Sequence, residues 1–102
     1  MEFVRGTSSA DGRFRITLAG ELDIQSVDQL DAAIALAASS TDRRVEVDMS
    51  EVQFIDSSGL RGLIRAFKRF DSDGKQLRII DPSDPVTRLL KLTGQFERFT
   101  AS

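Results

Sequence analysis

The chain contains no cysteine, histidine, tryptophan or tyrosine. Without cysteine, disulfide bonds and thiolate catalysis are excluded, and the reducing cytoplasm is permitted. Without histidine, Ser-His-Asp catalysis and the common zinc sites are excluded. The seven aromatic residues are all phenylalanines, and most lie at core spacing, which disfavours base stacking on nucleic acid. These absences exclude more chemistry than any residue present suggests.

Long apolar runs are also missing. No segment approaches the roughly 20 apolar residues that span a bilayer, and the N-terminus lacks a signal-peptide layout. The net charge is −2, so the chain has no overall attraction to nucleic acid. We therefore expect a cytoplasmic protein with no membrane insertion and no nucleic-acid partner. At 102 residues, the chain is most simply one domain over residues 1–102.

Alternation of apolar and polar residues predicts the strands. A short first strand is expected over residues 2–5, and Asp11-Gly12 predicts a tight turn before a second strand over residues 14–18. The chain is then expected to leave the strand at residues 19–23. Further strands are expected over residues 45–49 and 77–80. In the first, every second residue is apolar; in the second, Leu77 and Ile79 share one face.

Spacing of three and four residues predicts three helices. The first starts at Ser26, with Gln29 completing a capping box. The second runs from the turn at residues 56–59 to Asp73-Gly74. The third follows Pro82, with Ser83 or Asp84 as its cap. The apolar positions of these helices are Val27, Leu30, Ala33, Ile34 and Ala37; Leu60, Leu63, Ile64, Phe67 and Phe70; and Val86, Leu89, Leu90 and Leu92. Thr93-Gly94 closes the third helix, and Phe96 and Phe99 form a last packed segment.

Strands that alternate with helices predict an α/β fold with parallel pairing through right-handed crossovers. The strands alternate in polarity, whereas a sheet covered on both faces would have continuously apolar strands. We therefore expect a mixed, mostly parallel sheet of four to five strands, with helices mainly on one face and a polar opposite face.

The turn at Asp56-Ser57-Ser58-Gly59 is the main candidate site. In one interpretation, a serine oxygen caps the following helix by accepting a hydrogen bond from a first-turn N–H group. In the other, a serine accepts a phosphate, which a helix N-terminus tolerates because of its free N–H groups and partial positive charge. The two roles are compatible.

Three carboxylates follow expected strands, at Asp23, Asp56 and Asp81. In a parallel sheet they would gather at the carboxyl edge, where ligands of open α/β sheets bind. A magnesium site or an aspartyl-phosphate switch would use such a cluster. The simpler interpretation is that Asp is common in strand-to-helix turns because it caps helices.

A basic stripe follows the candidate turn, formed by Arg61, Arg65, Lys68 and Arg69. Such runs are usually solvated helix faces. Arg61 lies one turn beyond Ser57 and Arg65 one turn further, so the stripe could also meet an acidic partner or shield a phosphate.

Four segments resemble the STAS domain family, and more narrowly the bacterial anti-sigma factor antagonists. They are Gly20-Glu21-Leu22-Asp23, residues 45–50, residues 54–60, and residues 86–90 with Thr93-Gly94. The resemblance covers nearly the whole chain in order, and it implies a single STAS-type domain. It also implies a non-enzymatic protein without cofactors.

The resemblance further implies the partners and the site residues. An unphosphorylated antagonist binds an anti-sigma factor with serine kinase activity and so frees a sigma factor for transcription. The kinase phosphorylates the serine after the motif Asp, here Ser57 with Ser58 as alternate, and a serine phosphatase reverses this. The implied partner-binding residues are Asp23, Asp56, Ser57, Ser58, Gly59, Arg61 and Arg65.

Arg61 and Arg65 depart from the family, in which small residues often stand at these positions. Their charge predicts a partner with a matching acidic patch. Two other functions remain possible for this sequence. The first is that of a STAS domain in a stress-signalling scaffold or a lipid-transport complex. The second is that of a magnesium-dependent or aspartyl-phosphate enzyme.

Overall fold

Strands and helices alternate along residues 3–100, which are the residues that the computed structural model describes. Two strands begin the described chain, and each later strand is followed by a helix. The elements are β1 (Val4–Ala10), β2 (Arg13–Leu22), α1 (Val27–Ser39), β3 (Arg44–Ile55), α2 (Ser57–Ser72), β4 (Gln76–Ile80), α3 (Asp84–Leu92) and α4 (Phe96–Thr100). Within this range, no helix combines the length and apolar character that crossing a membrane requires.

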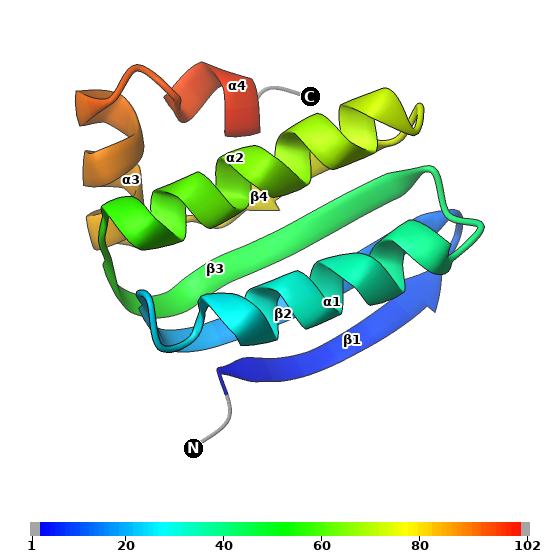
Figure 1. Cartoon of the computed structure of the whole chain (residues 1–102), viewed down its shortest axis with the longest axis horizontal. Coiled ribbons are helices and arrows are strands. Elements are labelled where there is room, and N and C mark those ends of the chain that lie inside the picture. The colour runs from blue at the N-terminus through cyan, green and yellow to red at the C-terminus, as the bar shows by residue number, and fades with distance from the viewer. Residues whose placement is uncertain (1–2, 101–102) are drawn as a thin grey trace.

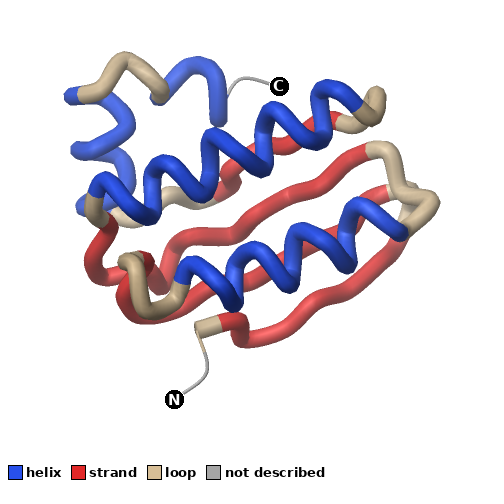
Figure 2. The backbone as a smooth tube through the Cα atoms, in the orientation of Figure 1, coloured by secondary structure: helices blue, strands red, loops and turns tan. Residues whose placement is uncertain are grey.

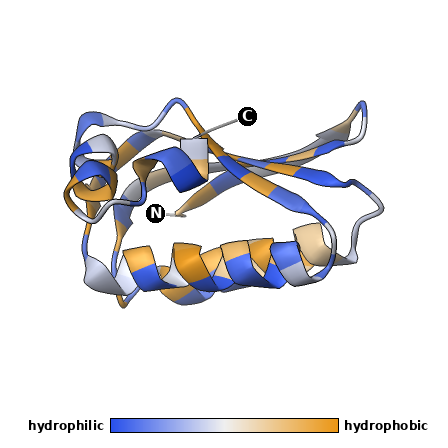
Figure 3. Cartoon of the chain, turned by 90° about the horizontal axis from the view of Figure 1, so that it is seen from above, coloured by the Kyte–Doolittle hydropathy of each residue, from blue (hydrophilic) through white to orange (hydrophobic). Residues whose placement is uncertain are grey.

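The sheet has the order β1-β2-β3-β4. β1 and β2 form an antiparallel hairpin, and β2, β3 and β4 are parallel. The helices α1 and α2 provide the two crossovers and lie side by side against one face of the sheet (Figures 1 and 2). Figure 3 shows these two helices as one layer, with hydrophobic residues facing the sheet. The expected α/β fold, with its mixed and mostly parallel sheet, is confirmed.

The core forms between the sheet and these helices. The alternating residues of β2 and β3 are buried as predicted, and so are the apolar positions of α1. On α2, Ile64 and Phe67 are only partly buried. The prediction for Leu92 is wrong, because α3 turns only Val86 and Leu90 fully inward and leaves Leu92 77% exposed. The opposite sheet face carries polar side chains such as Arg15, Glu46 and Arg78, which occupy one row across three strands.

Two strands run further than their local patterns predicted. β1 extends to Ala10 instead of ending at Arg5, because it pairs with β2 up to the turn at Asp11-Gly12; Glu2 lies outside the described residues. β2 continues to Leu22 instead of ending at Leu18. It keeps pairing with β3 through two register shifts, and Gly20 adopts a φ of +94° beside the second shift. Glycine takes that backbone conformation without the penalty of a Cβ atom.

The cap of α1 also differs from the prediction. Ser26 does precede α1, but its hydroxyl donates to the carbonyl oxygen of Glu21 at 2.6 Å and makes no capping bond. The Oε1 atom of Gln29 accepts instead from the backbone N–H of Phe3 at 3.0 Å. The capping-box prediction is therefore wrong, because the Ser26 side chain bonds to Glu21 and the Gln29 side chain bonds to Phe3. The glycine C-cap at Gly94 is confirmed by its φ of +71°.

Candidate functional site

The candidate site lies where β2 and β3 end together. Leu22 and Ile55 are paired in parallel, and the N–H of Asp56 donates to the carbonyl oxygen of Leu22 at 3.3 Å. Asp23 and Asp56 directly follow the last residues of these two neighbouring strands. The structure therefore brings these two predicted site residues to one sheet edge, at the start of α2 (Figure 1).

Asp56 caps α2. Its Oδ1 atom accepts a hydrogen bond from the N–H of Gly59 at 3.0 Å, and its backbone is extended as an N-cap requires. Ser57 and Ser58 are the first two helical residues, so the prediction that a serine caps the helix is wrong. In the part of the chain that the structure describes, neither serine hydroxyl makes a hydrogen bond to another residue. Ser57 is exposed and Ser58 is partly buried, which makes Ser57 the more accessible hydroxyl.

Gly59 packs against β2. A Cβ atom at Gly59 would lie 2.5 Å from the carbonyl oxygen of Leu22 and 2.7 Å from its Cγ atom, both closer than real contacts allow. The glycine thus lets the first turn of α2 sit directly on the end of β2. Because Gly59 is buried, its role here is to hold the turn in place beneath the two serines.

Asp23 orders the loop between β2 and α1. Its Oδ1 atom accepts from the N–H groups of Gln25 at 3.0 Å and Ser26 at 3.3 Å. The hydroxyl of Ser26 accepts in turn from the N–H of Asp23 at 3.0 Å. Asp23 is partly buried, so one of its oxygens shapes the loop while the residue still reaches the surface beside the site.

Asp81 does not join the other two carboxylates. β4 ends at Ile80, which is paired with Asp48, whereas β3 continues to Ile55. The chain after β4 therefore sits beside the middle of β3, where the N–H of Ser83 donates to the carbonyl oxygen of Met49 at 3.2 Å. The predicted gathering of three carboxylates is wrong. Among residues 3–100, no group of three acidic side chains is arranged to hold a metal ion.

The basic stripe on α2 divides into two kinds of residue. Arg65 pairs with Asp31 of α1, with 3.4 Å between Nη2 and Oδ2. Arg61 is exposed and has no ion pair with any residue in the described range. Gly62, between them, faces inward, and a Cβ atom there would lie 2.8 Å from Cγ2 of Val27. Arg61 is therefore the cation of this stripe nearest to Ser57 that is free to meet a partner.

Two apolar side chains near the site were missed from the sequence. Ile24, directly after Asp23, is 69% exposed, and Phe54, two residues before Asp56, is 47% exposed. Phe54 sits at the end of a strand whose earlier apolar residues are buried, and local pattern alone did not reveal its exposure. Their exposed side chains leave apolar area near the turn that a partner protein could bury.

Comparison with protein families identifies the fold. The family model described as "Mlab, STAS domain" matches residues 6–95, which is most of the chain. The chain belongs to the STAS domain family. This confirms the resemblance seen in the Gly20–Asp23 and Asp56–Gly59 segments, which lie side by side in the structure.

Individual STAS relatives cover most of this chain. The anti-sigma-B factor antagonist of Staphylococcus aureus (strain NCTC 8325 / PS 47) is 28% identical over 88 residues, covering 86% of this chain and 82% of that protein. The anti-sigma factor antagonist SpoIIAA, unphosphorylated, matches with a TM-score of 0.78 and 21% identity over 93% of this chain and 84% of its own.

The phosphorylated form of SpoIIAA, a Bacillus cell fate determinant, matches with a TM-score of 0.73 and 20% identity over 93% of this chain and 86% of its own. The same fold also occurs within the longer protein Mglu, with a TM-score of 0.71 and 22% identity over 80% of this chain. This STAS chain spans 20% of the length of that protein. These structural likenesses show the fold.

Proposed function

We propose that this STAS domain is an anti-sigma factor antagonist whose binding is switched off by phosphorylation of Ser57. The main support for the proposal is that Asp56, and not Ser57, makes the capping hydrogen bond at the start of α2. Asp56 caps the helix, which leaves the exposed Ser57 hydroxyl without a structural role in the described residues. Modification of that hydroxyl would leave the hydrogen bonds of the fold intact.

The surroundings of Ser57 suit a binding surface. Ile24, directly after Asp23, and Phe54, near the end of β3, offer exposed apolar area. Arg61, one turn along α2, adds a positive charge that has no ion pair within residues 3–100. A partner that buries the apolar side chains and offers an acidic group to Arg61 would complement this surface. Asp23, Asp56 and Ser58 complete the proposed contact set, and Gly59 supports it from beneath.

The proposed partner is an anti-sigma factor with serine kinase activity. In the phosphorylation step, the Ser57 oxygen forms a bond to the γ-phosphorus of ATP, and the bond between that phosphorus and ADP breaks. The hydroxyl proton passes to a base of the kinase. A serine phosphatase hydrolyses the phosphate and restores the binding form. The chain itself acts as a substrate and a binding protein, and it catalyses no reaction.

The phosphate would disrupt binding by charge and desolvation. It adds about −1.5 to −2 charges at a surface that already carries Asp23 and Asp56. Burying that charge in an apolar contact is unfavourable unless new partners satisfy it. The free N–H groups at the start of α2 and the helix dipole stabilise the phosphate within the folded chain. The modification therefore changes the interface and leaves the domain folded.

The experiment that tests this proposal is phosphorylation with mapping of the modified residue. The purified chain is incubated with a candidate anti-sigma kinase and ATP, and the peptides are analysed by mass spectrometry. We expect one phosphate on Ser57 in the wild type and in Ser58→Ala, and none on Ser57→Ala. Modification of Ser58 in the wild type would contradict the residue assignment, and no modification by any anti-sigma kinase of the source organism would contradict the proposal.

The alternatives from the sequence predict different results. A subunit of a stress-signalling scaffold or a lipid-transport complex would ignore the anti-sigma kinases and co-purify with its own assembly, such as a transporter ATPase. An aspartyl-phosphate enzyme would take up phosphate from a small phosphodonor, and that labelling would be lost in Asp56→Asn but kept in Ser57→Ala.

A further inference from the structure

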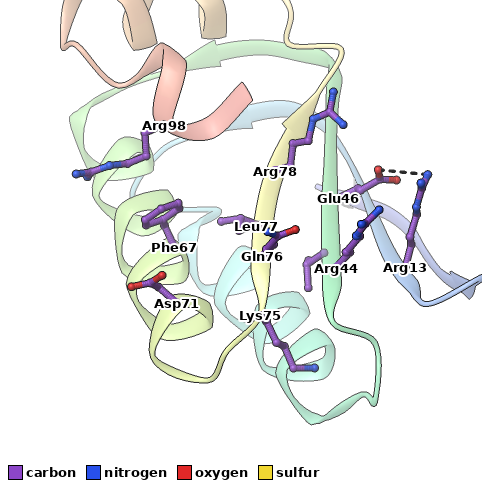
Figure 4. A pocket seen from close by; sticks show the side chains of 11 residues that line it. Arg13, Arg44, Glu46, Phe67, Asp71, Lys75, Gln76, Leu77, Arg78 and Arg98 are labelled. Atoms are coloured by element: carbon purple, nitrogen blue, oxygen red, sulfur yellow. Dashed lines mark ion pairs between the residues drawn. The ribbon is translucent and has the colours of Figure 1, made fainter. Parts of the chain in front are cut away.

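Among residues 3–100, no strand pairs with the outer edge of β4. β4 is the last strand in the sheet order, and residues 75–78 line a cavity of about 470 Å³ that runs around this edge. Figure 4 shows cavity residues on both sides of the strand. They are Phe67, Asp71 and Arg98 on the helix side and Arg13, Arg44 and Glu46 on the open sheet face. The cavity therefore follows the free edge of β4, where Gln76 and Arg78 are exposed on the open face and Leu77 is buried on the helix side.

The cavity is positively charged, although the chain has a net charge of −2. Five of its lining side chains are cationic and two are carboxylates. Glu46 is already paired with Arg13, at 3.8 Å, and lies 3.9 Å from Arg15. Arg78 on β4 and Arg44 on the adjacent β3 are exposed on the open sheet face, and neither has an ion pair within the described residues. The open face near this edge therefore presents two guanidinium groups without an ion pair in the described residues, one on β4 and one on the neighbouring β3.

The helix side of the same edge is partly apolar. The Phe67 ring of α2 contacts the Phe99 ring edge-on, with 5.6 Å between centroids. The guanidinium of Arg98 lies 5.3 Å from the centre of the Phe67 ring. Leu77 of β4 points to this side. An extended chain beside β4 would have arginines on one face, and on the other face its side chains would lie next to the buried Leu77 and the partly buried Phe67.

We propose that the edge of β4 binds an acidic segment of a partner protein, which adds to the sheet as a fifth strand. The backbone N–H and C=O groups at the free edge supply the pairing. Side chains of a strand alternate between the two faces, so the segment carries Asp or Glu at every second position, on the open face that holds Arg78 of β4 and, one strand further in, Arg44 of β3. Its intervening residues are apolar and face Phe67 and Leu77.

A second copy of this chain fits the edge poorly. Pairing two β4 edges would bring the arginines of both copies to the same interface, and like charges across a strand pair are destabilising. Charged residues on a short edge strand are a common protection against such self-association. The same charges attract an acidic segment, so the charge pattern selects the partner class.

This surface is separate from the proposed phosphoacceptor site. Arg44 begins β3, whereas Asp56 and Ser57 follow its last residue, so the two surfaces lie at opposite ends of a 12-residue strand. A partner could therefore occupy the β4 edge while an anti-sigma factor occupies the Ser57 surface. Substitution at Ser57 should leave binding at β4 unchanged, which separates a failure of one proposal from a failure of the other.

A synthetic peptide tests the β4 proposal. The probe is a labelled peptide of alternating glutamate and valine, and two controls replace glutamate by lysine or methylate the backbone nitrogens that would pair with β4. We expect the glutamate peptide to bind, with amide chemical-shift changes concentrated at residues 75–80, and both controls to bind at least tenfold more weakly. Equal binding of the lysine peptide, or shifts centred elsewhere, would overturn the proposal. Undiminished binding of the methylated peptide would mean anion binding without strand addition and would also overturn it.

Charge-reversal variants give the matched control. Arg44→Glu combined with Arg78→Glu should weaken the glutamate peptide at least tenfold, because both lining arginines of the open face that lack an ion pair in the described residues are reversed. Arg88→Glu changes the charge at an exposed site on α3 outside the cavity and should leave the affinity within twofold. Thermal unfolding of each variant checks that the fold is kept. Unchanged affinity in the folded double variant would refute the assignment.

Discussion

The carbonyl oxygen of Leu22 lies 2.5 Å from the position that a Cβ atom on Gly59 would occupy. The end of β2 and the first turn of α2 are therefore in direct backbone contact, and only glycine permits it. This contact joins the two sequence segments that mark the family, Gly20–Asp23 and Asp56–Gly59. It also holds the first turn of α2, which begins with Ser57, against the end of β2.

Gly59→Ala should destabilise the domain by about 1–3 kcal/mol, because the new methyl group must push against a backbone atom of β2. Urea unfolding measures the change in free energy. Gly6→Ala is the matched control, since nothing lies within 4 Å of a Cβ atom at Gly6. Equal stability of the two variants would show that the contact between Leu22 and Gly59 is not as tight as described.

Lys75 ties the start of β4 to the end of α1. Its Nζ atom donates to the carbonyl oxygens of Ser40 and Asp42, each at 2.7 Å, and to that of Ala37 at 3.2 Å. Lys75→Met keeps the aliphatic stem but removes these donors, and it should lower the free energy of unfolding by about 1–3 kcal/mol. Lys68→Met, at an exposed position on α2, should change it by less than about 0.5 kcal/mol. Similar losses in both variants would argue against a specific role for the Lys75 ammonium.

Arg61→Glu should weaken binding of the anti-sigma factor by roughly tenfold at low salt, and the effect should shrink at high salt because solvent ions screen the charges. Arg65 needs a further control, since it also pairs with Asp31. Combining Arg65→Glu with Asp31→Lys restores an internal pair while keeping the reversed charge at position 65. If the charge of Arg61 and Arg65 selects the partner, neither variant binds normally. Unchanged affinity in both, measured by calorimetry, would remove the stripe from the interface.

Ile24→Ser and Phe54→Ser should each weaken the anti-sigma factor complex by about 1–2 kcal/mol, because each removes apolar area that the partner buries. Leu36→Ser is the control, since Leu36 is 52% exposed near the far end of α1. The affinities can be compared by surface plasmon resonance. A loss in Leu36→Ser as large as in the other two would mean that apolar exposure alone, and not position, determines the effect.

Residue alternation and helical spacing predicted most of the fold. Val45, Val47 and Met49 are all fully buried, as their alternation required. The pattern did not reveal where strands stop, because pairing with a neighbour extends them beyond their periodic part. β2 reaches Leu22 through register shifts at which Gly20 has a positive φ, and no local period records such shifts.

The candidate site was predicted in position but not in detail. Asp and Ser are equally good N-cap residues, so the sequence did not decide that Asp56 and not a serine would cap α2. The displacement of Asp81 depends on β4 being much shorter than β3, which is a tertiary property. Lys75 contacts residues more than 30 positions away along the chain, and composition carries no sign of such a contact.

In the proposed switch, phosphorylation of Ser57 controls binding. The affinity of one anti-sigma factor for three forms of the chain tests this directly. Isothermal titration would compare the unmodified protein, Ser57→Ala and Ser57→Asp, with thermal unfolding to confirm that each is folded. We predict that the alanine variant binds within about threefold of the unmodified protein and the aspartate variant at least tenfold more weakly, a difference of about 1.4 kcal/mol or more. Equal affinities for the alanine and aspartate variants would contradict the switch.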